Sequence, residues 1–345
     1  MASERSIATR YQVPILDGPA RSWLHRGVTT SSVHGRYRVE SVEFPSGGTT
    51  LRGNLYVPAD LDEASGAVPI LGPYCYVKEQ APVQYATRLA DEGFVALAFD
   101  ARHHGASEGE PRRYEDPHTK VADLRAALDF LTTRPEVDPS QLAAVGVCEG
   151  SSEVLRAAVD DDRLTAVATI SGHYRDHGND IALMGGMALM NGDVETAEIA
   201  DRLEARRARG QAARARFEAT GEVEYLPIID PVRTDVALPW KPIWDWYHGW
   251  ADRGIWENRY AVMSDEPYLD FESLSAAEEL TTPLLMVHAD NSDGPDSARR
   301  HFAAVRGTDK HLAWQGSNDH FQYYEDPAVI DTAVGLAAAW FRDHR

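Results

Sequence analysis

The sequence predicts an α/β fold in which a mostly parallel sheet is covered by helices on both faces. Two observations carry this prediction: short apolar segments of strand length recur along the chain, and amphipathic segments of helix length separate them. Strands that alternate with helices at such spacings are typical of parallel sheets whose two faces are both buried. A third observation is that residues 174–280 break the alternation, which indicates an insertion into this fold.

The predicted elements begin after an N-terminal arm, residues 1–35, that has no clear periodicity. Residues 37–44 alternate as a half-buried strand does, and residues 51–57 follow as its hairpin partner. Buried strands are expected at 68–71, 94–99, 142–147, 164–170 and 283–288, and helices at 80–92, 119–134, 150–160, 296–305 and 327–343.

The core is therefore expected to comprise residues 36–173 and 281–345, with 174–280 as a mainly helical cap over the active-site face. The cap contains a charged helix at 194–220 and an aromatic cluster made of Trp240, Trp244, Trp246, Tyr247, Trp250, Trp256 and Tyr260. These side chains, with Met184, Met187 and Met190, form either an apolar wall of a substrate pocket or a small core of the cap itself. The sequence leaves both interpretations open.

Composition excludes several classes of partner. The net charge is -20, from 54 acidic and 34 basic residues, which argues against binding to nucleic acid or to an anionic membrane surface. No apolar run approaches the roughly 20 residues that a membrane span needs, and the first residues lack the pattern of a secretion signal. We therefore expect a cytoplasmic protein whose partner is a small molecule.

No cofactor or metal is expected from the sequence. Its two cysteines, Cys75 and Cys148, cannot form a disulfide framework, and no Cys/His spacing of a zinc site is present. The chain also lacks the Gly-x-Gly-x-x-Gly fingerprint of a dinucleotide site.

Residues 146–150, Gly-Val-Cys-Glu-Gly, are the most informative segment for chemistry. They follow an apolar strand and precede a helix, and this arrangement lifts a nucleophile above a parallel sheet. Glycines on both sides permit a strained central residue and close neighbours. The nucleophile would be the thiol of Cys148, and we expect the following helix N-terminus and a nearby histidine to lower its pKa.

A nucleophilic thiol needs a base, and the base needs an acid that orients it. His320 is the predicted base because it lies in a polar loop between a strand-like segment and the last helix. The acid is expected just beyond the strand that ends at His288. Asp290 is preferred because it is nearest the strand end, Asp293 is second, and Asp296 lies in the same loop.

The oxyanion hole would consist of two backbone N–H groups. One belongs to Glu149, directly after the nucleophile, and the other to the loop after the first buried strand. Pro73 has no N–H to donate, so Tyr74 or Cys75 must supply the second group, and we prefer Tyr74.

Several further runs complete a recognisable pattern: Val77-Lys78-Glu79-Gln80, residues 99–112, Glu115-Asp116-Pro117, residues 135–139, Ser171-Gly172, and residues 323–327 after His320. From about residue 36 to its end, the chain resembles the α/β-hydrolase superfamily, and more narrowly the dienelactone-hydrolase-like bacterial hydrolases. The resemblance implies an α/β-hydrolase fold with an inserted cap, and a nucleophile, acid and histidine in that chain order.

Three departures from the family pattern indicate a specialised substrate. Gly72-Pro73 stands where relatives usually carry His-Gly, and residues 149–153 contain two glutamates where relatives have small residues. The acid strand is followed by residues 289–293, Ala-Asp-Asn-Ser-Asp, in place of Gly-x-x-Asp. A carboxylate beside the thiol is expected to raise its pKa.

The first hypothesis for function is a hydrolase that cleaves an ester, lactone or thioester through an acyl-enzyme on Cys148. The second is an acyltransferase or cyclase, in which another nucleophile intercepts the same intermediate. The third is a non-catalytic scaffold that binds a small molecule. An apolar or aromatic acyl group fits the cap composition, and the sequence is compatible with a homodimer.

Overall fold

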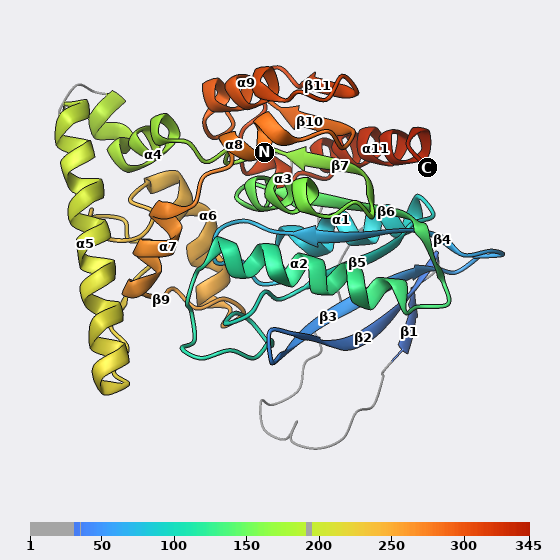
Figure 1. The fold of residues 1–345 in the computed structure, drawn as a ribbon, viewed down its shortest axis with the longest axis horizontal. Coiled ribbons are helices and arrows are strands. Elements are labelled where there is room, and N and C mark those ends of the chain that lie inside the picture. The colour runs from blue at the N-terminus through green and yellow to red at the C-terminus, as the bar shows by residue number, and fades with distance from the viewer. Residues whose placement is uncertain (1–30, 35, 191–194) are drawn as a thin grey trace, which may run out of the picture.

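A computed structural model of the protein describes residues 31–34, 36–190 and 195–345, with side chains for 36–183 and 195–345. These residues form a nine-stranded sheet in the order β1-β2-β3-β5-β4-β6-β7-β10-β11 (Figure 1). The strands are β1 (Ser31–His34), β2 (Tyr37–Ser46), β3 (Thr49–Pro58), β4 (Ser65–Leu71), β5 (Val95–Phe99), β6 (Val137–Val147), β7 (Leu164–Ile170), β10 (Leu284–His288) and β11 (Lys310–Trp314).

The sheet is antiparallel at one edge and parallel elsewhere. β2 and β3 pair as the predicted hairpin, and β3 joins the sheet by antiparallel pairing with β5. From β5 through β4, β6, β7 and β10 to β11 every pairing is parallel, which confirms the predicted fold class. Within the arm assigned to residues 1–35, Ser31–His34 forms a strand that pairs with β2, and residues 1–30 and 35 lie outside the described residues.

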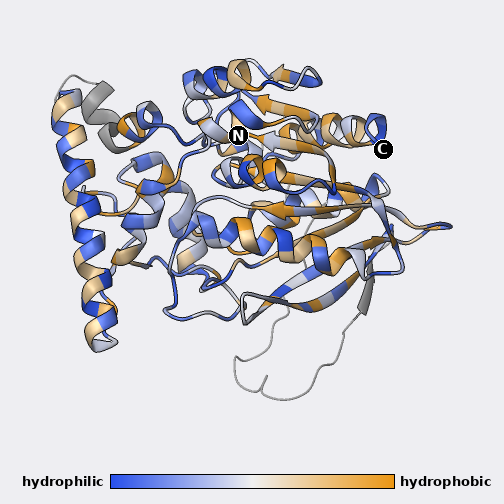
Figure 2. Cartoon of the chain, viewed as in Figure 1, coloured by the Kyte–Doolittle hydropathy of each residue, from blue (hydrophilic) through white to orange (hydrophobic). Residues whose placement is uncertain are grey.

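Helices cover both faces of the sheet. Side chains alternate along β5: Val95, Leu97 and Phe99 join one buried cluster, and Ala96 and Ala98 join another on the opposite face. α2 (Pro117–Thr132), α3 (Gly150–Asp160) and α9 (Pro295–Ala304) pack on the first cluster, and α1 (Ala81–Asp91), α10 (Gln322–Glu325) and α11 (Pro327–Asp343) on the second. Figure 2 shows that the strands between these layers are mostly hydrophobic.

The insertion lies between β7 and β10 and is mainly helical. It contains α4 (His177–Met190), α5 (Thr196–Thr220), β8 (Tyr225–Leu226), α6 (Lys241–Asp252), β9 (Tyr260–Ala261), the 3-10 turn η1 (Val262–Ser264), α7 (Asp265–Asp270) and α8 (Leu274–Glu279). The long helix α5 lies on the side away from the sheet (Figure 1), where Arg206 pairs with buried Asp265 of α7 at 2.5 Å. The structure does not describe residues 191–194, and it describes no side chains for Met184, Met187 or Met190.

The aromatic residues of the insertion form a core that extends to the loop after β4. Tyr247, Trp256 and Tyr260 are buried in one cluster with Tyr74 and Cys75 of that loop. The indole N–H of Trp256 donates to the carbonyl of Cys75 at 2.8 Å. These rings therefore both make a core for the insertion and attach it to a loop at the carboxyl end of the sheet.

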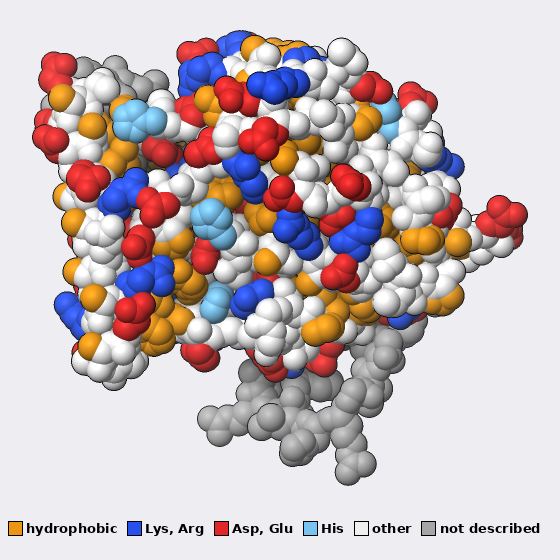
Figure 3. All heavy atoms as spheres, in the orientation of Figure 1, with side chains coloured by type: hydrophobic (Ala, Val, Ile, Leu, Met, Phe, Trp, Pro, Cys, Tyr) orange, Lys and Arg blue, Asp and Glu red, His pale blue; other side chains and the backbone are white. Residues whose placement is uncertain are grey.

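The surface carries mixed charge. Acidic and basic side chains are interspersed over the face drawn in Figure 3. Among the described residues, no helix has both the length and the apolar character of a membrane span.

Candidate active site

The predicted strand–turn–helix around Cys148 is confirmed. Cys148 lies between β6 and α3 with φ at +56°, a backbone conformation that residues other than glycine rarely adopt. A Cβ on Gly146 would lie 2.3 Å from the carbonyl oxygen of Gly150, and one on Gly150 would lie 2.6 Å from that of Leu71. The two glycines are required because backbone passes too close for any side chain.

Three backbone hydrogen bonds hold Cys148 in this strained turn. Its N–H donates to the carbonyl of Ile170 at 3.1 Å, and its carbonyl accepts from Ser151 at 3.1 Å and from His173 at 2.9 Å. The elbow is thereby attached to the first turn of α3 and to the segment after β7. Such fixation lets the surrounding fold bear the strain at Cys148.

The thiol of Cys148 is protonated at neutral pH. Burial above all, together with the carboxylates of Asp293 and Glu149, raises its pKa to about 12. Hydrogen bonds from Tyr324 and from the Glu149 amide act in the opposite direction but are outweighed. The expectation of a lowered pKa is therefore wrong, because desolvation exceeds the effect of the helix N-terminus. The carboxylate of Glu149, beside the thiol, raises the pKa of Cys148 as expected.

His320 lies between β11 and α10, close to the elbow. Its Nδ1 lies 2.8 Å from Ser171 Oγ and 3.2 Å from the backbone nitrogen of Asp293. Its Nε2 lies 2.8 Å from the hydroxyl of Tyr324. Burial lowers the pKa of His320 from its usual value and Asp293 partly opposes this, so the imidazole is neutral at neutral pH and can accept a proton.

Tyr324 connects the thiol to the imidazole. Its hydroxyl lies 2.8 Å from His320 Nε2, and it lowers the pKa of the neighbouring Cys148 thiol. The sequence reasoning assigned no role to Tyr324, which lies in the short helix α10 that follows His320.

The three candidate acids have different surroundings. Asp290 is 56% exposed and contacts Trp314 Nε1 at 2.9 Å and Arg299 at 3.4 Å, on the outside of the loop. Asp296 is 86% exposed and pairs with the same arginine. Asp293 points inward, where His173 and His320 hold the pKa of its carboxyl well below the usual range in spite of burial.

His173 is the direct partner of the Asp293 carboxylate. Its Nδ1 forms an ion pair with Asp293 and lies 3.0 Å from the side-chain nitrogen of Asn179. Its Nε2 lies 3.3 Å from the hydroxyl of Tyr268, which belongs to α7 of the insertion. Burial opposes a charge on His173, but Asp293 outweighs it and raises the pKa of the imidazole. Sequence reasoning missed this residue, because only its place after Ser171-Gly172 marks it.

The loop predicted to complete the oxyanion hole lies against the elbow. The N–H of Gly150 donates to the carbonyl of Gly72 at 3.1 Å, which joins the loop to the first turn of α3. From the insertion, the hydroxyl of Tyr247 reaches the carbonyl of Tyr74 at 3.4 Å. Cys75 has φ at +51°, so the loop carries its own strained residue next to the elbow.

The carboxylate of Glu149 faces a buried charged cluster made of Glu115, Lys120, Glu149 and Glu153. Lys120 Nζ lies 3.1 Å from Glu149 and 3.5 Å from Glu153, and it also pairs with Glu115. Although burial acts to raise the pKa of Glu149, Lys120 holds it below its usual value. The side chain of Glu149 is thus committed to Lys120, which leaves its backbone N–H on the side of Cys148.

A known protein family matches most of the chain, including the segments that form this site. The pattern of the X-Pro dipeptidyl-peptidase (S15 family) fits residues 47–322, which include the elbow, the acid loop and His320. The chain belongs to the X-Pro dipeptidyl-peptidase (S15) family. This S15 family protein is thus an α/β hydrolase, in agreement with the resemblance that its motifs indicate.

Curated relatives of this S15 family protein have several names. The uncharacterized protein YcjY of Escherichia coli is 27% identical over 299 residues, which cover 85% of this chain and 94% of YcjY. The polyketide transferase claH of Penicillium crustosum is 34% identical over 133 residues, 38% of this chain and 43% of claH. The thiohydrolase aneE of Aspergillus aculeatus is 30% identical over 124 residues, 36% of this chain and 38% of aneE.

Solved structures share the fold of this S15 family protein. The α/β hydrolase GrgF from Penicillium superimposes with a TM-score of 0.72 at 21% identity, over 89% of this chain and 98% of GrgF. A dienelactone hydrolase from Anabaena variabilis gives a TM-score of 0.52 at 14% identity, over 90% of this chain and 99% of that enzyme.

Proposed function

We propose that this S15 family protein is an acyl hydrolase that forms a covalent thioester on Cys148. The observation that carries the proposal is the place of the Tyr324 hydroxyl, 2.8 Å from His320 Nε2 and next to the Cys148 thiol whose pKa it lowers, at an elbow with φ of +56°. A nucleophile with a base in hydrogen-bonding reach is the signature of nucleophilic catalysis. The partial relatives named thiohydrolase and polyketide transferase support a thioester as substrate.

In the first half-reaction, the sulfur of Cys148 attacks the carbonyl carbon of the substrate. The thiol proton passes to Tyr324 as the Tyr324 proton passes to His320 Nε2, so the imidazole becomes an imidazolium. The bond from the carbonyl carbon to the leaving thiol then breaks, and His320 returns the proton to that thiol. In the second half, water attacks the acyl-enzyme, His320 takes its proton, and the acid is released with Cys148 restored as a thiol.

The tautomer of His320 decides whether this path is open. In one tautomer Nδ1 accepts the N–H of Asp293 at 3.2 Å, and Nε2 carries the proton. In the other, Nδ1 donates to Ser171 Oγ at 2.8 Å, and Nε2 is free to accept the proton from Tyr324. The proposed path requires the second tautomer, which Ser171 stabilises by accepting a hydrogen bond from Nδ1.

We assign the role of the acid to Asp293 in place of the preferred Asp290. The Asp293 carboxylate interacts electrostatically with His320 and stabilises its protonated form, whereas Asp290 is bound on the outside of the loop by Trp314 and Arg299. His173 holds the Asp293 carboxylate in place and shares its charge. Such an acid stabilises the imidazolium without taking its proton.

The oxyanion of the tetrahedral intermediate would be held by the N–H groups of Glu149 and Tyr74. The Glu149 amide lies beside the Cys148 side chain and lowers the pKa of its thiol, so it is next to the carbon that the sulfur would attack. Each such donor is worth about 3 kcal/mol of transition-state stabilisation. Residues 174–280 act as the cap over this site, and their aromatic side chains favour an apolar or aromatic acyl group.

Acyl transfer to a second substrate is the other candidate, and the packing of the cap favours it. Trp246 of α6 stacks on Phe321 and lies edge-on to Tyr324, next to the base. An indole over this position limits the access of water to an acyl-enzyme, so the intermediate lasts longer and can react with another acceptor.

The two free cysteines suit a reducing compartment such as the cytoplasm.

The test is to measure thiol release from acyl and aryl thioesters, with and without an added amine or alcohol acceptor. Wild-type protein is expected to release thiol, and His320→Asn to release it at least about 10³-fold more slowly. Free acid as the sole product identifies a hydrolase, and acylated acceptor identifies a transferase. Absence of turnover over a panel of esters, lactones and thioesters would leave a non-catalytic scaffold.

A further inference from the structure

The geometry points to a zinc site formed by Cys75, His104 and Glu115, next to the active site but separate from Cys148. Their ligand atoms, a sulfur, a ring nitrogen and a carboxylate oxygen, all lie within 4.8 Å of one another. All three residues are buried, with at most 1% of each exposed. Sulfur, imidazole and carboxylate donors together are a set that zinc binds, with water as the usual fourth ligand.

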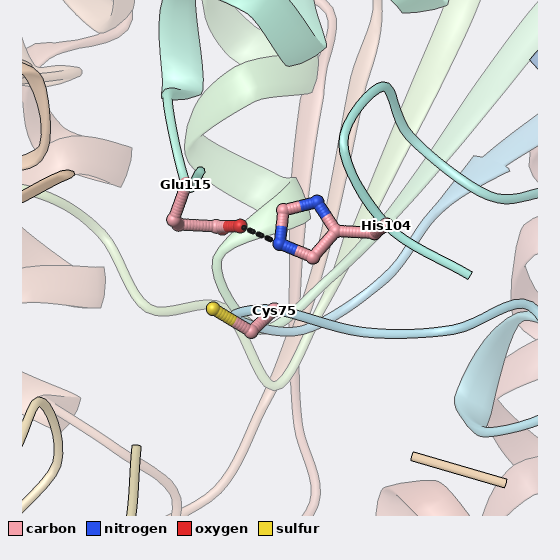
Figure 4. A group of neighbouring side chains, drawn as sticks. All are labelled: Cys75, His104 and Glu115. Carbon is pink, nitrogen blue, oxygen red and sulfur yellow. Dashed lines mark ion pairs between the residues drawn. The ribbon is translucent and has the colours of Figure 1, made fainter. Parts of the chain in front are cut away.

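Figure 4 shows the side chains converging from two loops. Cys75 lies in the loop after β4, and His104 and Glu115 lie in the loop between β5 and α2. β4 and β5 are parallel neighbours, so both loops leave the same edge of the sheet. No local sequence spacing reveals the group, because the fold brings its members together.

The His104 ring is oriented as metal-bound histidines are. Its Nδ1 lies 3.0 Å from the carbonyl oxygen of Arg102, which can only accept, so Nδ1 carries the proton. Nε2 therefore presents a lone pair to the cluster. A histidine that donates its other N–H to a carbonyl is the usual outer-shell arrangement of a metal ligand.

Two acceptors face each other in this cluster. His104 Nε2 and Glu115 Oε2 lie 3.1 Å apart, and neither makes a hydrogen bond among the described residues. Two lone pairs at this distance, both buried, need a cation or a proton between them. The other oxygen of Glu115 is held by Lys120, which leaves Oε2 directed toward His104.

The charge around the group also favours a divalent cation. Glu115, Glu149 and Glu153 are three buried carboxylates, and Lys120 is the ammonium that pairs with them. Ionising all four groups would give the cluster two more negative than positive charges, a state that is costly to bury without a further cation or proton. Binding replaces the proton of Cys75 with zinc: the S–H bond breaks, a bond from sulfur to zinc forms, and the proton leaves to solvent.

The inference is independent of the proposed function, because it concerns a different thiol. The experiment uses the full-length chain, stripped with a chelator and then reloaded with Zn²⁺ or Co²⁺ alone and desalted. We expect one zinc per chain by elemental analysis, and a thiolate-to-cobalt charge-transfer band in the Co²⁺ form. Both should persist in Cys148→Ala, the matched control that removes the other thiol.

Cys75→Ser should abolish the charge-transfer band, and His104→Gln should lower zinc retention at least about tenfold, in line with the loss of a metal ligand or its support. Should these variants fail to fold, X-ray absorption of the zinc-loaded wild type decides, with sulfur and nitrogen or oxygen donors expected. The inference is overturned by no retained zinc, which would mean that His104 and Glu115 share a proton. It is equally overturned by a zinc shell without sulfur, or by binding that is lost in Cys148→Ala.

Discussion

Cys148 and Glu149 are adjacent in sequence, yet they belong to regions with opposite electrostatics. The Cys148 thiol, the Tyr324 hydroxyl and the His320 imidazole are all neutral at neutral pH. Glu149 points into the cluster around Lys120, where buried charges oppose one another. The region around Cys148 thus suits the movement of protons, whereas in the Lys120 cluster three carboxylates share one ammonium.

The largest expected effect separates the two regions directly. Cys148→Ala should reduce turnover by about 10³-fold or more, because no other group in the path can hold the acyl intermediate. Its melting temperature should stay near that of the wild type, since the thiol is partly buried and makes few polar contacts. Steady-state thioester cleavage and thermal unfolding measure the two quantities, and turnover near the wild-type level would refute the role of Cys148.

Asp293→Asn should lower kcat by up to about 10⁴-fold, as expected when the acid of a triad loses its charge. Asp290→Asn is the matched control in the same loop, and its kcat should be unchanged because Asp290 lies outside with Arg299 and Trp314. The kinetics of both variants on one substrate check the assignment. The reverse result, with Asp290→Asn the inactive variant, would restore the acid that the sequence favoured.

Lys120→Met should act on stability. Removing the ammonium leaves carboxylates buried without their partner, and the free energy of unfolding should fall by about 3–5 kcal/mol. Lys241→Met is the control, because Lys241 forms an exposed pair with Asp245 and pairs of that kind contribute about 0.5 kcal/mol or less. Urea unfolding of the two variants gives the comparison, and equal losses would show that the cluster does not depend on charge balance.

Tyr324→Phe tests the connection between thiol and base. Losing the hydroxyl removes one step of the proton path, and we expect kcat to fall by about 10- to 100-fold with little change in KM. Tyr323→Phe is the control on the neighbouring residue, whose backbone carbonyl, not its hydroxyl, binds Tyr85 at 2.8 Å. A Tyr324→Phe variant with full activity would mean that His320 reaches Cys148 directly.

The pH dependence of thiol alkylation tests the protonation state of Cys148. Because the pKa of Cys148 is raised to about 12, the thiolate fraction grows with every step in pH, and alkylation by iodoacetamide should still be accelerating at about pH 10. Mass spectrometry of the Cys148 peptide follows the rate. A plateau below about pH 8 would indicate a preformed thiolate instead.

Much of the fold could be predicted because its signals are local. The period-2 alternation in residues 37–44, the short apolar strands and the amphipathic helices each arise from neighbours in sequence, and the structure confirms them with small shifts at their ends. β6 starts at Val137, earlier than predicted, because the polar segment around Pro139 has no strand-like pattern of its own. Ser31–His34 was missed for the same reason, since its strand forms only by pairing with β2.

Site residues that a local motif marks could be predicted from the sequence. Residues that only long-range contacts bring to the site could not. The glycines around Cys148 signal the elbow locally, and the loop position of His320 follows from the order of strands. The partners His173 and Lys120 come from distant segments, so no spacing could connect them to the elbow. The pKa of Cys148 is raised, whereas the sequence predicted that it is lowered. Burial causes the rise, and burial depends on how the whole fold packs around the thiol.

The most direct test of the account is the intact mass of the protein after brief exposure to an acyl thioester, for wild type and Cys148→Ala. One acyl adduct is expected on the wild type, mapped to the peptide that contains Cys148, and none on the variant. The adduct should decay in water, or faster with an added acceptor if the protein is a transferase. An adduct of equal yield on Cys148→Ala, or turnover by the wild type with no adduct at the shortest times, would contradict the central claim.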